Sequence, residues 1–272
     1  MGGSYWLYSK KEAVMNELFS FRRFGRLFVK HTVEHYRTYL MATGILVGFL
    51  VLTGSFLFFL IPALPDINFQ LASYVIVMFV AGGLFTSSIF ADYGDKNRAI
   101  PALTLPATSL EKFLVGWLWS FPIFLVVYTA VFYLAVWGLS SIRLSGGKQG
   151  FAIFSFVQPQ VSVMLVLFTE VHALALFGAI FFRKLPFIRT GFSFFVALAM
   201  TMLLNTIFLK VLTGVRVIKP ALPFGNLNFY QGDKFYTVET GDKADWFIQG
   251  LVLIAALLTW AASYYRLKEK RV

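Results

Sequence analysis

The sequence predicts an all-α membrane protein with six transmembrane helices, which are preceded by an interfacial amphipathic helix and have both termini in the cytoplasm. Of its 272 residues, 58% are hydrophobic and only 14% are charged, which is too apolar for a soluble domain of this length. Six stretches are long enough to cross a hydrocarbon core of about 30 Å, a distance that takes about 20 helical residues. The basic residues also gather in alternate connectors between these stretches.

The expected membrane spans are apolar windows that contain almost no charge. They are Tyr39–Ile61, Gln70–Phe90, Phe113–Leu139, Val161–Phe182, Gly191–Thr213 and Trp246–Tyr265. The predicted six-helix transmembrane domain therefore covers residues 39–265. It lies between a cytoplasmic N-terminal segment, 1–38, and a basic cytoplasmic tail, 266–272.

The distribution of basic residues predicts the orientation in the membrane. Seventeen of the 24 Lys and Arg residues fall on the side that holds both termini, whereas the connector PALPDINF has none. The positive-inside rule makes the basic side the cytoplasm, so the connector 91–112 is expected inside. We therefore expect a multi-pass protein of the cell (inner) membrane. This placement accounts for the net charge of +11 without a nucleic-acid partner.

The stretch before the first span, MNELFSFRRFGRLFVKHTVEHYR, has a helical pattern. Three phenylalanines recur on one face and three basic residues recur every four positions on another; they are Phe21, Phe24 and Phe28, and Arg22, Arg26 and Lys30. The pattern predicts a basic amphipathic helix that contacts the lipid bilayer at the cytoplasmic interface. The simpler alternative is a basic flank that only orients the first span. Met1 and Met15 both remain candidate starts.

The sequence offers little that indicates catalysis. Histidine is limited to His31, His35 and His172, cysteine is absent, and no H-E-x-x-H or G-x-S-x-G motif occurs. The segment LSGGKQG at 144–150 is similar to a signature of ABC ATPases, but it lies in an external connector and no phosphate-binding loop accompanies it. We therefore expect no enzyme activity, no metal and no cofactor on this chain.

Glu170 is the only acidic residue inside an expected span, so it should face protein or a water-filled cavity. Counted from the cytoplasmic ends of their spans, Glu170 and Asn205 lie at similar depth, and His172 is level with Thr201. Glu170 and His172 are two residues apart and do not share a helix face. These polar residues form either part of a transport path or hydrogen bonds that pin spans four and five together.

The connector ADYGDKNRAIPALTLPATSLEKF, residues 91–113, is expected to be an ordered elbow. Thr108 and Glu111 form a T-x-x-E capping box, which satisfies free backbone amides where span three begins. The elbow should present charged residues and an apolar contact surface to a soluble cytoplasmic partner. The charged residues are Asp95, Lys96, Arg98, Glu111 and Lys112, and the apolar ones are Ile100 and Leu103.

This layout resembles the membrane subunits of type-2 ABC transporter permeases. The resemblance extends to the elbow segment LPATSLEKFLVGWL, in which Leu105, Pro106, Ser109 and Lys112 match best. It implies that the elbow acts as a coupling helix against a separate ABC ATPase subunit, which would bind ATP and Mg. It also implies that two permease subunits, as a homodimer or a pair of homologues, form a path at their interface. Short re-entrant helices are expected before the last span.

Two functions from different classes follow. The first is a permease subunit that moves an unidentified substrate with ATP hydrolysed by its partner. The second is a non-transporting membrane scaffold or assembly subunit of a larger complex, in which Glu170 and Asn205 only pack. An intramembrane enzyme ranks third, because no catalytic constellation is present.

Overall fold

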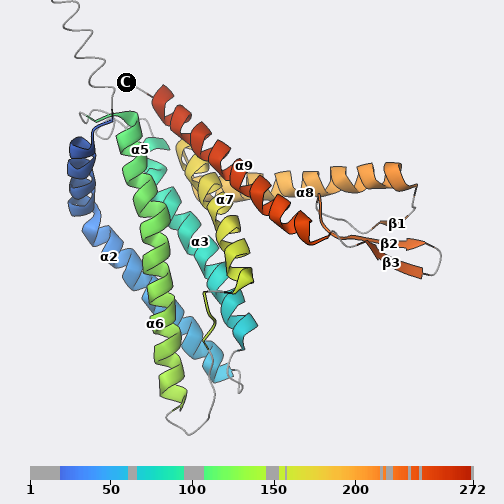
Figure 1. The fold of residues 1–272 in the computed structure, drawn as a ribbon. Helices are drawn as coiled ribbons and strands as arrows, with labels where there is room; N and C mark the ends of the chain where they lie inside the picture. Colours follow the sequence, from blue (N-terminus) through green and yellow to red (C-terminus); the bar gives the residue numbers. More distant parts are fainter. Residues whose placement is uncertain are drawn as a thin grey trace, which may run out of the picture.

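The computed structural model describes residues 19–60, 66–94, 107–144, 153–156, 158–214, 217–218, 223–231, 234–238 and 241–270, and long helices make up most of them (Figure 1). The helices are α2 (Phe21–Leu60), α3 (Ile67–Gly94), α5 (Ser109–Leu118), the π-helix η1 (Trp119–Ile123), α6 (Phe124–Leu144), α7 (Pro159–Phe181), α8 (Pro186–Thr213) and α9 (Asp242–Glu269). In this described part, six helical segments are long and apolar enough to cross a membrane, with α5, η1 and α6 forming one of them. The predicted helical class and the six membrane-spanning lengths are confirmed.

Helix α2 contains 40 residues and is continuous from the basic stretch into the first apolar span. The basic stretch expected to form its own helix is instead the first half of α2. The physical reason is that residues 21–60 include no proline, so nothing in the sequence breaks the backbone hydrogen-bond ladder. At 1.5 Å per residue, α2 is about 60 Å long, roughly twice the thickness of a hydrocarbon core. Its ribbon changes direction after the dark blue start (Figure 1).

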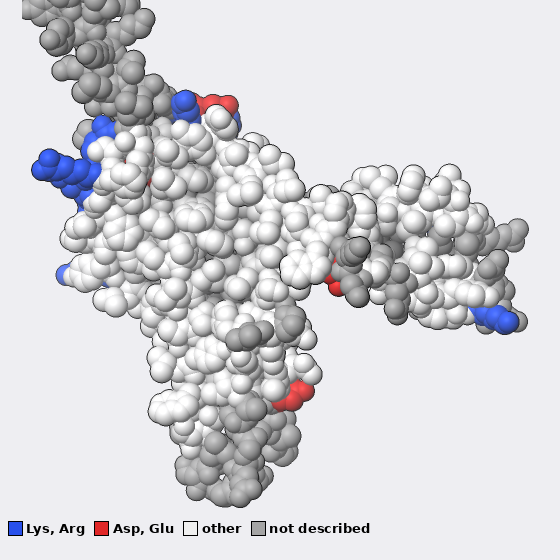
Figure 2. Space-filling view, in the orientation of Figure 1, with Lys and Arg blue, Asp and Glu red and all other residues white. Residues whose placement is uncertain are grey.

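Helices α2, α3, α6 and α7 lie side by side, and we call the end where α2 and α5 begin and α9 ends the α5 end (Figure 1). A cluster of buried aromatic side chains joins α3, α6 and α7, with Tyr74, Tyr128 and Phe168 at its centre. The Tyr128 hydroxyl donates to the Tyr74 carbonyl at 2.6 Å. Between the ends of the bundle, the face seen in Figure 2 carries almost no charge, as a surface in contact with lipid requires.

A second apolar cluster lies at the α5 end, where Phe90, Phe113, Ile180 and Leu267 bring α3, α5, α7 and α9 together. Lys270 closes this end. Its Nζ donates to the Tyr93 carbonyl at 2.7 Å and to the Ile180 carbonyl at 2.6 Å. One cation therefore satisfies the free carbonyls at the ends of α3 and α7. Burial lowers the pKa of Lys270, and two neighbouring arginines lower it further.

Helix α8 leaves the bundle at a wide angle, with a small sheet beyond it (Figure 1). None of its residues is buried. The turn that redirects the chain is at Leu185, which has a positive φ of 49°. The start of α8 is held against α7 by a close approach of Thr190 to Gly178, where any larger side chain would collide with the Thr190 hydroxyl.

The connector before α9 forms an antiparallel sheet in its described part, not the expected re-entrant helices. The strands are β1 (Val217–Ile218), β2 (Leu227–Gln231) and β3 (Lys234–Val238), in the order β1-β2-β3. Aromatic residues pair across β2 and β3, with Phe229 stacked on Tyr236. Such cross-strand aromatic pairs stabilise a hairpin. After the sheet, α9 continues through Glu269, so Arg266 and Lys268 of the predicted basic tail lie in its last turn.

Candidate functional site

The predicted capping box begins α5. The Glu111 backbone N–H donates to Thr108 Oγ1 at 3.1 Å, and the Thr108 backbone N–H donates to Glu111 Oε2 at 2.9 Å. Both bonds of the motif are therefore present, and the T-x-x-E prediction is confirmed. This fixes the residue of the elbow at which α5 begins.

The same carboxylate also closes the start of α2. Glu111 Oε1 accepts the Ser20 backbone N–H at 2.8 Å and the Arg23 guanidinium at 3.1 Å. The Glu111 side chain is fully buried in this arrangement. A buried carboxylate requires such partners, because without them it would lose the hydration it has in water. We call the group of Ser20, Arg23, Thr108 and Glu111 the Glu111 junction.

The burial of this junction corrects part of the elbow prediction. Glu111 and Lys112 were expected at the surface, yet both are buried. The reason for Glu111 is that α2 packs over the start of α5 and supplies its partners. The other expected elbow residues lie outside the described residues; they are Asp95, Lys96, Arg98, Ile100 and Leu103. Sequence reasoning missed Ser20 and Arg23, since no local pattern links them to a residue about 90 positions away.

The first half of α2 has an inner and an outer face. Phe24 and Phe28 are half-buried, and the Phe28 ring stacks on Trp119 of η1, with ring centroids 5.8 Å apart. Phe21 is 84% exposed, so the three phenylalanines do not share one buried face. The basic residues behave as predicted in that Arg22, Arg26 and Lys30 are all exposed on one face, four residues apart.

A buried histidine joins three helices. His172 of α7 is fully buried, and the indole N–H of Trp260 in α9 donates to its Nδ1 at 3.1 Å. Because an indole nitrogen only donates, Nδ1 accepts, and the neutral ring carries its proton on Nε2. His172 Nε2 therefore donates to Ser120 Oγ of η1, 2.9 Å away. We call these three residues the His172 relay.

The π-helix η1 places Ser120 opposite His172. Pro122 lies inside η1, and a proline ring provides no N–H and collides with the preceding turn of an α-helix. A wider turn accommodates that ring, which explains why the third span is not a continuous α-helix. Ser120 is buried within this turn and donates to the Trp117 carbonyl at 3.4 Å.

The polar residues that were predicted to lie at similar depth in α7 and α8 have different contacts. His172 and Thr201 do not pair, because both ring nitrogens of His172 are occupied by the relay and Thr201 donates to the Ala197 carbonyl of its own helix. Counting residues along two helices gave similar depths but could not show which neighbours each helix faces. Glu170 and Asn205 are both half-buried. Glu170 Oε2 is buried and has no hydrogen-bond partner, so that oxygen does not bond Asn205.

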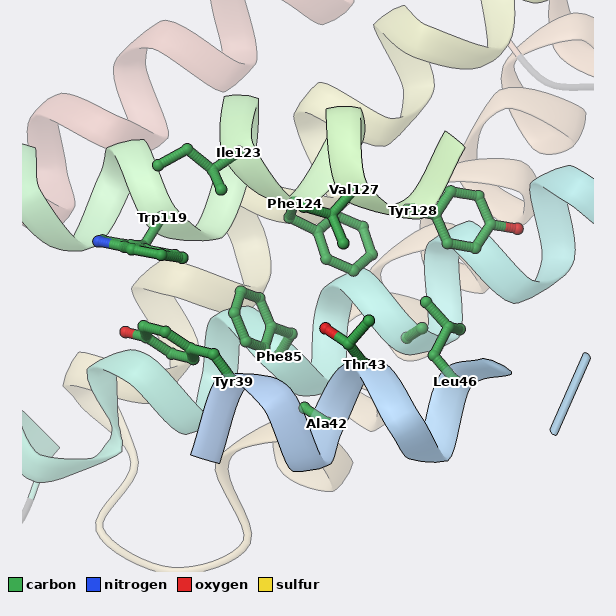
Figure 3. Close-up of a pocket in the computed structure, with 11 residues that line it drawn as sticks. Tyr39, Ala42, Thr43, Leu46, Phe85, Trp119, Ile123, Phe124, Val127 and Tyr128 are labelled. Carbon is green, nitrogen blue, oxygen red and sulfur yellow. The ribbon is translucent and has the colours of Figure 1, made fainter. Parts of the chain in front are cut away.

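A small cavity of about 110 Å³ lies between α2, α3 and the η1–α6 segment (Figure 3). Its walls are apolar and aromatic: Tyr39, Ala42, Thr43, Leu46, Ala81, Phe85, Trp119, Ile123, Phe124, Val127 and Tyr128. Tyr39 and Trp119 stack at one end, with centroids 4.3 Å apart. No charged side chain lines it, so its chemistry suits an apolar group and not an ion. In the described residues, no cluster of three metal-binding side chains occurs.

The chain matches no protein-family model, and no curated protein or solved structure resembles it at a significant level. The functional proposal therefore depends on the sequence and on the geometry described above.

Proposed function

We propose that this chain is the membrane-spanning permease subunit of an ABC transporter, which moves an unidentified substrate using ATP hydrolysed by a separate ATPase subunit. The Glu111 junction is the observation that carries the proposal. It includes Thr108 and Glu111 of the elbow and ties the starts of α2 and α5 to one carboxylate. If a soluble partner displaced the elbow, the movement would therefore be transmitted both to α2 and to the span that begins with α5.

The His172 relay extends this mechanical connection. It links η1, which follows α5 in the chain, to α7 and α9 through buried hydrogen bonds. Together the Glu111 junction and the relay connect α2, α5, η1, α7 and α9. In the proposed mechanism, ATP-driven closure of the partner subunits moves the elbow, and these contacts distribute the movement among the spans. ATP and Mg belong to the partner.

A second permease subunit, identical or homologous, would complete the substrate path. Helix α8 has no buried residue within one chain, and it carries apolar residues on all sides. Glu170, with one buried carboxylate oxygen that lacks a partner, is the residue we place nearest to such a path. The positive-inside rule assigns the α5 end to the cytoplasm.

The scaffold function is favoured by one observation. His172 uses both ring nitrogens in contacts within the chain, which is what a packing residue does. A scaffold, however, requires no connection between an elbow and several spans. The permease is therefore the better-supported function.

Purification of the tagged chain from its own membranes in mild detergent tests the proposal. We expect an ATPase subunit to co-purify and the complex to hydrolyse ATP in a vanadate-sensitive manner. Ile100→Asp in the elbow should remove most of that ATPase while the amount of chain stays unchanged, because a buried apolar contact can supply about 2 kcal/mol or more of binding. Lys234→Ala, in the exposed strand β3, is the control. Absence of both an ATPase subunit and ATP hydrolysis from the wild-type preparation would contradict the proposal.

A further inference from the structure

The outer face of α2 at the α5 end carries more cations than anions. Arg22 and Arg26 are exposed, and among the described residues neither has an ion pair with an acidic side chain. Lys30 is 3.7 Å from Glu34, in a pair whose side chains are 46% and 53% exposed. Such an exposed pair is weak. Arg23 differs from these residues because it turns inward to Glu111. Figure 2 shows Lys and Arg side chains gathered at the edge of the molecule over the start of α2.

The depth of this face follows from the length of α2. Measured back from Leu60, a hydrocarbon core of about 30 Å takes about 20 residues and ends near Tyr39. Tyr39 stacks on Trp119 there, and both residue types favour the boundary between lipid tails and headgroups. The residues of α2 before Tyr39 therefore lie beyond the hydrocarbon core, on the side of the headgroups at the α5 end.

We propose that Arg22, Arg26 and Lys30 bind the phosphate groups of anionic phospholipids in the leaflet at the α5 end. We call these three residues the α2 basic face. Guanidinium groups form paired hydrogen bonds with phosphate oxygens, and basic clusters beside a membrane span attract anionic lipid. This proposal does not depend on the transport function.

The neighbours of the α2 basic face favour lipid over an acidic protein as the occupant. Phe21, Val29 and Val33 are 84%, 60% and 64% exposed, and they flank the basic residues. A helix that places large apolar side chains beside cations suits the interface of a bilayer, where the apolar groups enter the region of the acyl chains. Interfaces with soluble proteins instead surround a small apolar centre with a polar rim.

Lipid binding would also stabilise the Glu111 junction. Arg22 and Arg23 are adjacent, so one faces the leaflet while the other holds Glu111. A headgroup bound to the α2 basic face would keep the start of α2 in place against α5. The lipid composition of the leaflet would then affect how firmly the elbow is anchored.

The test measures the binding of fluorescent phosphatidylglycerol and phosphatidylcholine to the full chain in mixed micelles. The wild type should prefer phosphatidylglycerol, and the triple variant R22Q/R26Q/K30Q should lose about tenfold or more of that preference. The matched control, K184Q/R189Q/K268Q, removes the same charge from three other exposed positions and should keep the preference within about twofold. Thermal unfolding of both variants checks that each remains folded.

Three further results define the outcome. Phosphatidylglycerol binding by the wild type should weaken as salt is added. Inorganic phosphate at millimolar concentration should not displace the lipid, which separates a lipid site from a site for free phosphate. Equal losses of phosphatidylglycerol preference in the two triple variants, or no such preference in the wild type, would overturn the proposal. An acidic protein would then be the better candidate for binding the α2 basic face.

Discussion

Glu111 accepts a hydrogen bond from the backbone N–H of Ser20, 2.8 Å away, although the two residues are 91 positions apart. The other oxygen of the carboxylate accepts the Thr108 N–H at the start of α5. A single side chain therefore accepts backbone N–H groups at the starts of two helices that lie far apart in the sequence. The contact also brings the N-terminal basic stretch and the elbow into one structural unit.

Glu111→Ala should destabilise the protein by about 3 kcal/mol, because it leaves the Arg23 guanidinium and two backbone N–H groups without their buried partner. Thermal unfolding in detergent micelles measures the loss. Glu269→Ala is the matched control, since Glu269 pairs with Arg266 at the surface and its removal should change stability little. Similar losses in both variants would show that the Glu111 junction contributes no more than an exposed ion pair.

His172→Leu should cost about 2 kcal/mol of stability, because inside an apolar bundle the Trp260 N–H loses its acceptor and the Ser120 hydroxyl keeps only its bond to the Trp117 carbonyl. Nitrogen-15 spectra of labelled histidine should also show the ring of His172 neutral, with the proton on Nε2. An imidazolium ring, or a proton on Nδ1, would be incompatible with the Trp260 bond. A double-mutant cycle of Ser120→Ala and Trp260→Phe then separates the contributions of the two hydrogen bonds of the relay to stability.

Gly178→Ala should weaken the contact between α7 and α8, since the added methyl group would collide with Thr190. The expected loss is about 1–3 kcal/mol, as for other overpacked sites. Gly191→Ala is the control, because no atom lies within 4 Å of the position its side chain would occupy. Unfolding of the two variants under the same conditions gives the difference. A loss in Gly191→Ala as large as in Gly178→Ala would contradict the packing explanation, because helix propensity alone favours alanine over glycine at both positions.

The orientation can be measured directly, since the chain contains no cysteine. Single cysteines at Asp66, Lys148 and Asp242 should react with an impermeant maleimide added to intact cells. Cysteines at Lys96 and Lys184 should react only after the membrane is opened. Labelling of Lys96 from outside would contradict the six-span topology.

Glu170→Gln should lower ATP hydrolysis by the reconstituted complex while leaving expression and assembly near those of the wild type. The amide keeps the shape of the side chain but removes the charge that a polar path would use. The amount of chain in the membrane is measured alongside. A parallel fall in chain and activity would instead support a packing role.

The features predicted correctly from the sequence are those with local causes. The six spans were predicted from the length of the apolar stretches. The bond between Thr108 and Glu111 was predicted from their spacing of three residues. The hairpin was missed although FYQGDKFYTV carries a readable signal, aromatic residues on both sides of a Gly-Asp pair. The expectation of re-entrant helices came from a family layout and not from these residues.

The contacts that were not predicted depend on how the helices pack. Arg23 meets Glu111, and Trp260 meets His172, across 88 positions of sequence in each case. The depth of a residue along a span can be counted from the sequence. The rotation of the helix about its axis and the identity of its neighbours cannot be obtained in this way. The wide turn at Pro122 adds to this difficulty, because it shifts the faces of α6 relative to those of α5.

The third span can vary in length at one place more easily than at others. A π-turn holds one residue more than an α-helix would, so deletion of Pro122 would restore α-helical geometry without rotating the flanking segments and would also remove the ring that an α-helix cannot accommodate. Glu111 would keep its bond to Ser20 and Tyr128 its bond to Tyr74. A deletion between Tyr128 and Phe132 in α6 would instead turn the residues beyond it by about 100° and move Phe132 out of the aromatic cluster. Related chains that differ in length by one residue in this span should therefore carry the gap at η1.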